Sequence, residues 1–380
     1  MTLNQRFFLT LGLVISLAVI PAQAQWQLSI GTYAGQDANL LRYYNPVGDV
    51  ILSPQAEIAY LGARTRFYYN HDLTRIVEND QYNYSMQQAG IDFIAGDEMD
   101  VSHYLGARFS MRQDAADYSY FDYWKAEGVY NFKYFPTGWA LLNGDLGIFY
   151  KKFDEEPAWN HWESNLSLSG SVFLPTRTTI RLSAIGFLRD FSSYTIRDSV
   201  SETDELASLW QLVGIVRLAQ SFGKQVGGFS EFLYRYNPSE GNPYQVEIAA
   251  FSPIDDYFGF KGYRWTNSLK WKINKQIWSK ISASAYENIY LNRPVYEFDF
   301  KTGNWLTDTD GEYIMLINNR RDHGYIAGIS AGLALPKIFN RAANLEIIGS
   351  FDYFHNESND AYFVYNDRSF GLQIRYDFQW

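Results

Sequence analysis

The sequence predicts an all-β fold: a closed antiparallel transmembrane β-barrel of about 16 strands, with short turns at one end and long loops at the other. Three observations predict it. From Trp26 onward, segments of about ten residues alternate apolar with polar or small side chains, the pattern of strands with one apolar face. The connections between these segments alternate in length. The last stretch, 370–380, carries an apolar or aromatic side chain at every even position.

Residues 1–24 are predicted to be a secretory signal peptide that is absent from the mature protein. Arg6 supplies the positive start, an apolar run extends from Phe7 to Ile20, and Ala22 and Ala24 provide small residues for cleavage. A membrane-spanning helix is the alternative, but the run has about 14 residues where roughly 20 are needed. The mature chain, 25–380, is predicted to be one domain.

Sixteen alternating segments follow in the mature chain. They lie near residues 26–35, 49–60, 63–73, 83–94, 101–112, 122–134, 139–151, 163–174, 179–190, 208–220, 225–236, 262–273, 277–290, 324–334, 343–354 and 368–380. An even number places both termini at the end of the barrel with the short turns. The longest loops, 237–261 and 291–323, either fold inward as a constriction or stand outside as a binding surface, and the sequence does not choose between these arrangements.

The final segment resembles the closing strand of bacterial outer-membrane β-barrel proteins, including porins. Leu372, Ile374, Tyr376 and Phe378 form the alternating apolar face of such a strand, although Trp380 stands where the family usually has Phe. The resemblance implies a place in the outer membrane of a Gram-negative-type bacterium, contact with its lipid, and recognition of this strand by the barrel-insertion machinery. Homo-oligomers are common among such proteins, but nothing in the sequence marks an interface. A soluble protein of stacked sheets is the alternative.

The residues opposite the apolar stripes are predicted to line the lumen. The basic residues on that face are Arg64, Arg66, Arg108, Arg112, Lys125, Lys133, Lys151, Arg181, Arg189, Arg235, Lys270, Lys272, Lys280 and Arg375. The acidic residues are Glu57, Asp92, Glu127, Asp145, Glu231, Glu346, Asp352 and Asp377. This count predicts a basic wall, whose register depends on the alternation, since a slip of one residue inverts the faces.

A basic wall favours a channel for small polar or anionic solutes, because a barrel of this size is too wide for side chains alone to fill and Arg and Lys favour anions in a pore. Three alternatives stay open. The charges neutralise one another in cross-strand ladders that only stabilise the barrel; the barrel exports an acidic polysaccharide or other polymer; or it is a structural or surface-binding barrel closed by its loops.

Aromatic side chains near the strand ends are predicted to form two girdles at the membrane–water boundaries, because Tyr and Trp combine an apolar body with a polar tip. The outer girdle is Trp124, Trp210 and Trp265, and the inner girdle is Tyr134, Trp139, Phe378 and Trp380.

Other functional classes have little support. The chain has no cysteine, which excludes disulfides and thiolate metal sites, and its net charge of −10 argues against a nucleic-acid partner. No cofactor or metal is predicted. Gly328, Ser330 and Gly332 match the G-x-S-x-G motif of hydrolases, but they lie inside an alternating strand rather than at a strand-to-helix turn. A hydrolase that uses His323 or His355 is therefore a minor alternative.

Overall fold

A computed structural model describes residues 25–379, except 43, 98–99, 192–194, 198–201, 205–207, 239–258, 292, 318 and 337–342. The predicted signal peptide and Trp380 lie outside the described residues. Among the described residues, no helix is long and apolar enough to cross a membrane. The short 3₁₀ helices are η1 (Asp80–Tyr82), η2 (Ala116–Phe121), η3 (Pro157–Trp159) and η6 (Ala361–Phe363).

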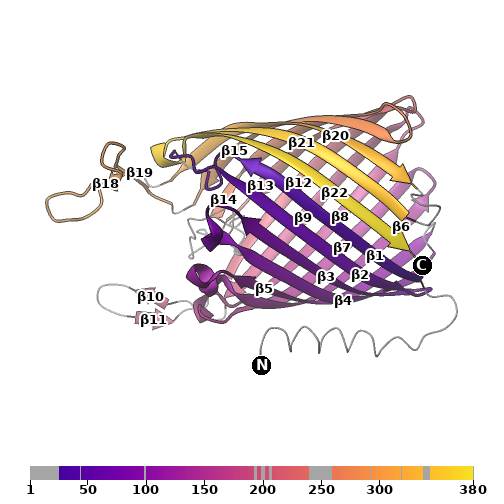
Figure 1. The fold of residues 1–380 in the computed structure, drawn as a ribbon, viewed down its shortest axis with the longest axis horizontal. Helices are drawn as coiled ribbons and strands as arrows, with labels where there is room; N and C mark the ends of the chain where they lie inside the picture. The colour runs from indigo at the N-terminus through magenta and orange to yellow at the C-terminus, as the bar shows by residue number, and fades with distance from the viewer. Residues whose placement is uncertain are drawn as a thin grey trace.

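In the described part of the chain, sixteen long strands form one closed barrel (Figure 1). They are β1 (Gln25–Asp37), β2 (Asp49–Leu61), β3 (Thr65–Ile76), β4 (Tyr84–Gly96), β5 (Val101–Asp114), β6 (Tyr123–Thr137), β7 (Ala140–Phe153), β8 (His161–Phe173), β9 (Thr178–Phe191), β12 (Ser208–Phe222), β13 (Val226–Tyr236), β14 (Phe260–Lys272), β15 (Ile277–Tyr290), β20 (Arg321–Pro336), β21 (Ala343–Ser358) and β22 (Tyr365–Gln379). Each predicted segment corresponds to one of these strands, with ends that differ by at most four residues. The predicted fold class is confirmed.

The barrel closes where its first and last strands meet. β1 pairs antiparallel with β22, from Gln27 opposite Gln379 to Asp37 opposite Ser369. Every other barrel strand pairs with its neighbours in the chain order. Closure leaves no strand edge without a partner, so the backbone N–H and C=O groups are satisfied where no water reaches.

The connections alternate in length as predicted. At the end that holds the chain termini, the turns are as short as 138–139, whereas loops at the opposite end include 38–48, 192–207 and 291–320. Outer-membrane barrels have short turns on the periplasmic side and long loops outside. We therefore call the end with the termini the periplasmic end and the other the outer end.

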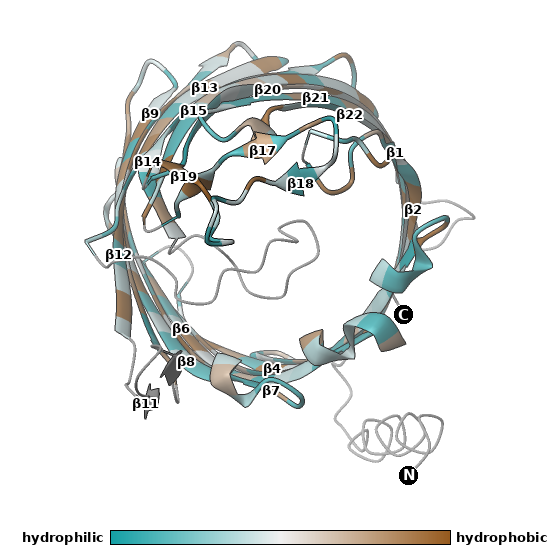
Figure 2. Cartoon of the chain, turned by 90° about the vertical axis from the view of Figure 1, so that its left-hand side faces the viewer, coloured by the Kyte–Doolittle hydropathy of each residue, from teal (hydrophilic) through white to brown (hydrophobic). Residues whose placement is uncertain are grey.

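The two faces of each strand differ in polarity. On the apolar faces, large side chains such as Leu105, Leu182 and Ile281 are 57–58% exposed. The polar faces are the inner ones, because Asp322 and Asn356 on them line a cavity together with loop residues at the outer mouth. Figure 2 shows the short strands of loop 291–320 within the outline of the barrel. The outer surface is thus an apolar belt suited to lipid.

Small apolar clusters hold the loops against the inner face at the outer end. Leu40 and Ile76 form one with Tyr82 and Tyr84, while Tyr123 and Phe153 form another with Trp159. Since burial of such side chains is favourable by roughly 1.5–3 kcal/mol each, these clusters fix the rim.

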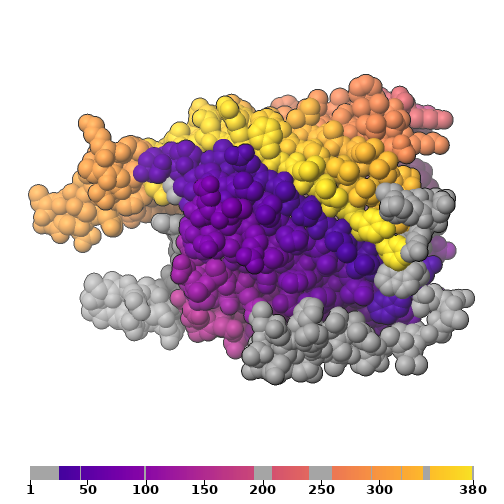
Figure 3. Space-filling model, in the orientation of Figure 1, coloured from indigo at the N-terminus to yellow at the C-terminus, as the bar shows by residue number. Residues whose placement is uncertain are grey.

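The longest described loop stands above the rim. It contains β16 (Val295–Tyr296), β17 (Phe298–Asp299), β18 (Asn304–Trp305) and β19 (Met315–Ile317). It projects beyond the outer ends of the strands (Figure 3). Another loop contains the short pair β10 (Thr195–Arg197) and β11 (Glu202–Asp204).

An aromatic cluster ties the longest loop to its neighbours. The ring of Tyr44, from the loop after β1, lies 5.2 Å from Phe298 and 5.2 Å from Tyr362. The ring of Phe298 lies 4.8 Å from Trp305. Tyr44 also donates a backbone hydrogen bond to the carbonyl of Tyr362 at 2.9 Å. Loop 291–320 therefore forms a cap fastened to the rim beside β1 and β22. Most of loop 237–261 lies outside the described residues.

Candidate functional site

The candidate site is the inner face of the barrel. The strand registers put thirteen of the fourteen predicted basic residues on the same face as the residues of the outer-mouth cavity. The exception is Arg64, which lies exposed in the turn before β3. Its carbonyl accepts a hydrogen bond from the N–H of Ile94 at 2.8 Å.

The inner face also carries charges that are not among the predicted lining residues. Two are basic, Arg217 and Arg264, and seven are acidic: Asp37, Asp49, Asp72, Asp114, Glu163, Asp322 and Asp367. The described inner strand faces therefore carry fifteen basic and fifteen acidic side chains, rather than the predicted excess of basic groups. Four of the omitted acids lie beyond the predicted strand bounds, because the strands extend further toward the outer end than their alternation suggested.

On one wall, the charges form a ladder across strands. The Arg66 guanidinium on β3 lies 2.5 Å from the Glu57 carboxylate on β2 and 3.9 Å from Asp92 on β4. Asp92, which is 4% exposed, also accepts a hydrogen bond from the Tyr104 hydroxyl at 2.5 Å.

The ladder continues on β5 and β6. The Arg108 guanidinium donates to the Tyr104 hydroxyl at 3.1 Å and lies 3.9 Å from the Glu127 carboxylate. The Lys125 ammonium lies 3.2 Å from the same carboxylate. Arg66, Arg108 and Lys125 therefore each have an acidic partner, and we call this part of the inner face, from β2 to β6, the ladder wall.

Further ion pairs lie near both ends of the barrel. Arg189 and Glu163 are both buried, with 2.7 Å between guanidinium and carboxylate. Arg112 pairs with Asp114 at 2.6 Å, and Arg375 pairs with Asp377 at 2.9 Å. Because removing one partner of a buried pair leaves a charge without compensation, the pairs of Arg189 and Arg112 stabilise the wall. The pair of Arg189 and Glu163 joins two strands, as the ladder interpretation predicts, whereas the pairs of Arg112 and Arg375 each lie within one strand.

The wall formed by β14 and β15 differs. Lys270, Lys272 and Lys280 occupy its inner face, and among the described residues none of the three forms an ion pair. Lys133 on β6 and Arg181 on β9 likewise lack one there, although Arg181 donates to the Ser171 hydroxyl at 3.0 Å. No described carboxylate therefore offsets the charge of these side chains at ion-pair distance.

At the outer mouth, a cavity of about 490 Å³ lies beneath the cap. Its lining includes the arginines Arg42, Arg264, Arg293 and Arg320 and the acids Asp322 and Asp360, together with aromatic rings. We call it the outer-mouth pocket.

The arginines of the outer-mouth pocket are held in different ways. Arg320 is buried and makes two hydrogen bonds to Asp322, one of them at 2.9 Å. The exposed Arg42, in left-handed backbone geometry with φ 55°, places its guanidinium 4.7 Å from the Phe354 ring centre. The exposed Arg264 lies 5.8 Å from the Tyr286 ring centre. The lining of the outer-mouth pocket therefore carries four arginines and two aspartates.

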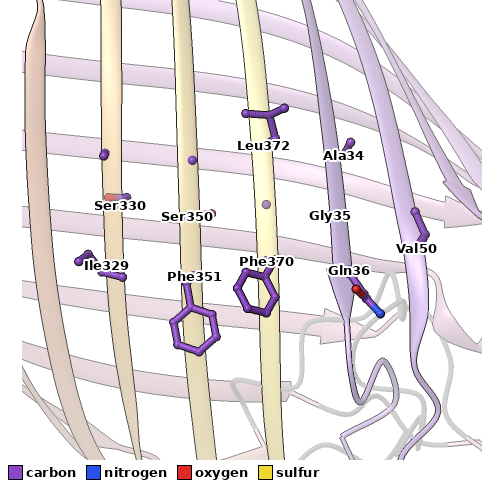
Figure 4. A pocket seen from close by; sticks show the side chains of 13 residues that line it. Ala34, Gly35, Gln36, Val50, Ile329, Ser330, Ser350, Phe351, Phe370 and Leu372 are labelled. Carbon is purple, nitrogen blue, oxygen red and sulfur yellow. The ribbon is translucent and has the colours of Figure 1, made fainter.

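A second, shallow depression faces the lipid. Figure 4 shows Phe351 and Phe370 beside small residues such as Ala34 on the outer face of β20, β21, β22 and β1. Its volume of about 690 Å³ exceeds that of the outer-mouth pocket. Because its large side chains, such as Phe351 and Phe370, belong to the outward apolar stripes, it lies outside the path of a solute.

The structure does not assemble the residues of the hydrolase alternative. Ser330 and His323 lie on opposite faces of β20, since Ser330 shares the inner face with Lys280 whereas His323 pairs with the outward-facing Glu287. His323 and His355 instead contact the two oxygens of Glu357, at 2.8 and 3.2 Å. Among the described residues, no group of three His, Cys, Asp or Glu side chains could hold a metal ion.

The predicted girdle residues have mixed positions. Trp124 and Trp210 lie on the outer face near the outer end of β6 and β12, and Tyr134 and Phe378 lie on the outer face near the periplasmic end. Trp139 is exposed in the turn between β6 and β7. Trp265 lies six residues into β14, where its indole N–H donates to the Ser230 hydroxyl at 2.8 Å.

Comparison with solved structures identifies the fold. The chain is similar to Acinetobacter baumannii OccAB1, with a TM-score of 0.51 and 9% identity over 94% of this chain and 96% of that one. It is also similar to OccAB3 of the same organism, with a TM-score of 0.51 and 9% identity over 95% and 100%. Pseudomonas aeruginosa OccK8 (OprE) gives 0.50 and 8% over 94% and 98%.

No family model matches the chain, and no characterised protein matches it in sequence. The chain nevertheless has the fold of outer-membrane porins. A barrel of this fold with an apolar outer belt resides in the bacterial outer membrane.

Proposed function

We propose that the chain is a channel that passes small polar and anionic solutes across the outer membrane. The observation that carries the proposal is the outer-mouth pocket, where arginines outnumber acids at the entrance to the barrel. Charged side chains that line a pore set its ion preference, and Arg and Lys favour anions. A barrel of sixteen strands also encloses more space than its side chains fill.

The inner wall contributes unequally to this function. The ladder wall offers little net charge, since its guanidinium and ammonium groups lie within 4 Å of carboxylates. The anion preference therefore arises from the outer-mouth pocket and from lysines without an acidic partner, Lys270, Lys272 and Lys280 among them. In this proposal, the lumen is basic at its two ends, and the wall between them is largely neutral.

Conductance of the refolded protein in a planar bilayer under a salt gradient tests the proposal. We expect steady conductance with a reversal potential that indicates anion preference. Arg264→Glu should move the reversal potential toward that of a nonselective pore, because it reverses a charge at the entrance. Lys152→Glu is the matched control: it reverses a basic charge on the opposite face of the wall, near the outer end of β7. A folded barrel without conductance would contradict the proposal.

A further inference from the structure

Two lysines stand directly opposite each other on the inner face near the periplasmic end. Lys270 on β14 pairs in register with Lys280 on β15, and Lys272 follows on the same face. Like charges in direct cross-strand register are destabilising. A position of this kind therefore needs either a neutralising neighbour or a ligand that brings negative charge.

Two other pairs of basic residues that stand in direct register on the inner face have such neighbours. Lys125 is opposite Lys151, but the Lys125 ammonium lies 3.2 Å from Glu127. The second pair, Arg181 and Arg217, also has an acidic neighbour.

In that second pair, Arg181 stands opposite Arg217, whose guanidinium lies 3.7 Å from the Glu231 carboxylate. For the Lys270 and Lys280 pair, no described carboxylate lies within 4.0 Å of either ammonium. The charge of Asp352, two strands away from β15, interacts with Lys280 only over a longer distance.

The surroundings of this pair leave room for a ligand. Lys270 faces Gly227 on β13, and Lys280 faces Ser330 on β20. The indole of Trp278 lies over Gly332, where a Cβ atom would clash with the ring. The Lys270 ammonium lies 4.2 Å from the centre of that ring. Small neighbours and one packed indole therefore keep a recess open beside the lysines.

The recess has a volume of about 420 Å³, and its lining adds two lysines from the turns at this end, Lys224 and Lys275. Four lysines and no acidic residue line it, together with Asn274, Gln225 and Gln276 among others. We call this site the lysine recess; it comprises the four lining lysines and Lys280, which is not in the lining but stands opposite Lys270 in register.

We propose that the lysine recess binds small multivalent oxyanions, such as phosphate esters or polycarboxylates, at the periplasmic end of the barrel. Several ammonium groups in one recess attract an ion with two or more negative charges far more than a monovalent one, since Coulomb energy scales with the product of charges. In transport, such an anion would occupy the recess before it leaves the lumen. This role of the site rests on the proposed function, which the inference deepens.

Calorimetric titration of the refolded, detergent-solubilised barrel with pyrophosphate tests the binding directly. We expect saturable binding that weakens as salt increases, because screening reduces the attraction. The double variant Lys270→Gln and Lys280→Gln should weaken binding about tenfold or more, equivalent to one decade in Kd. Lys261→Gln should leave it unchanged, because that lysine lies on the outward face of β14 at the opposite end.

Two further probes define the ligand class. Citrate should compete with pyrophosphate, whereas acetate at the same ionic strength should not. Absence of pyrophosphate binding to a folded barrel, equal competition by acetate, or undiminished binding to the double variant would each overturn the inference. Conductance is measured separately: binding without conductance would contradict the channel and not the recess, and conductance without binding would contradict the recess and not the channel.

Discussion

The ladder wall on β2 to β6 and the lysine recess on β14 and β15 show two uses of charge on one inner face. In the ladder, Arg66 and Arg108 lie among carboxylates and a tyrosine hydroxyl, so their charge is spent on holding neighbouring strands. In the recess, Lys270 and Lys280 face each other without an acid within ion-pair distance. The face on which a charged residue lies therefore does not define its role. What matters is whether the neighbouring strand places a carboxylate beside it, since a paired charge stabilises the barrel and an unpaired one can attract a solute.

The largest effect should come from breaking a buried pair on the compensated side. Glu163→Ala leaves Arg189, which is 1% exposed, without its carboxylate 2.7 Å away. We expect a loss of about 3–5 kcal/mol in the free energy of unfolding, measured by urea unfolding in lipid vesicles. Adding Arg189→Met should recover most of it, since an apolar side chain of similar volume needs no counter-charge. If Glu163→Ala unfolds at the same urea concentration as the parent, the pair does not stabilise the wall.

A smaller effect should follow from removing the central acid of the ladder. Asp92→Ala leaves the Tyr104 hydroxyl without its acceptor and Arg66 with one carboxylate fewer. We expect a loss of about 1–3 kcal/mol, the typical result of leaving a buried polar group unsatisfied. Tyr104→Phe and the double variant complete a mutant cycle. Additive losses would show that Asp92 and Tyr104 act independently, against the ladder.

The sequence predicts the barrel and the faces of its strands because both depend on a local period of two. Lys125, Lys270 and Arg375 occupy the predicted face, since one apolar surface must meet lipid along each whole strand. The alternation of 210–218 also places Arg217 on the inner face. Asp322 and Asp367 lie beyond the predicted ends of β20 and β22, where alternation gives way to loop sequence.

The outer-mouth pocket could not be predicted in the same way. Arg42, Arg293 and Arg320 come from loops without periodicity, and contacts between aromatic rings of distant loops, such as Tyr44 and Phe298, fix the cap above them. The ion pairs could not be predicted from the sequence either. A strand's own sequence gives the face of Arg108, but its partner Glu127 is set by the register with β6.

The smallest effect sharpens the comparison most, because the two walls should respond with opposite signs. Lys280→Gln removes repulsion with Lys270 and should stabilise the empty barrel by about 0.2–1 kcal/mol, the usual size of a cross-strand pair. Lys125→Gln makes the same chemical change opposite another lysine, but it also removes the ion pair with Glu127, so it should be neutral or destabilising. Urea unfolding of both variants at low salt, without multivalent anions, measures the difference.

The same measurement with pyrophosphate gives a second comparison. Pyrophosphate should make the parent more stable than the Lys280→Gln variant, because it binds the parent more tightly, and it should leave the difference between the parent and Lys125→Gln unchanged. If Lys280→Gln destabilises the barrel without any anion present, the lysines support the fold through contacts of their own, and the contrast between the two walls fails.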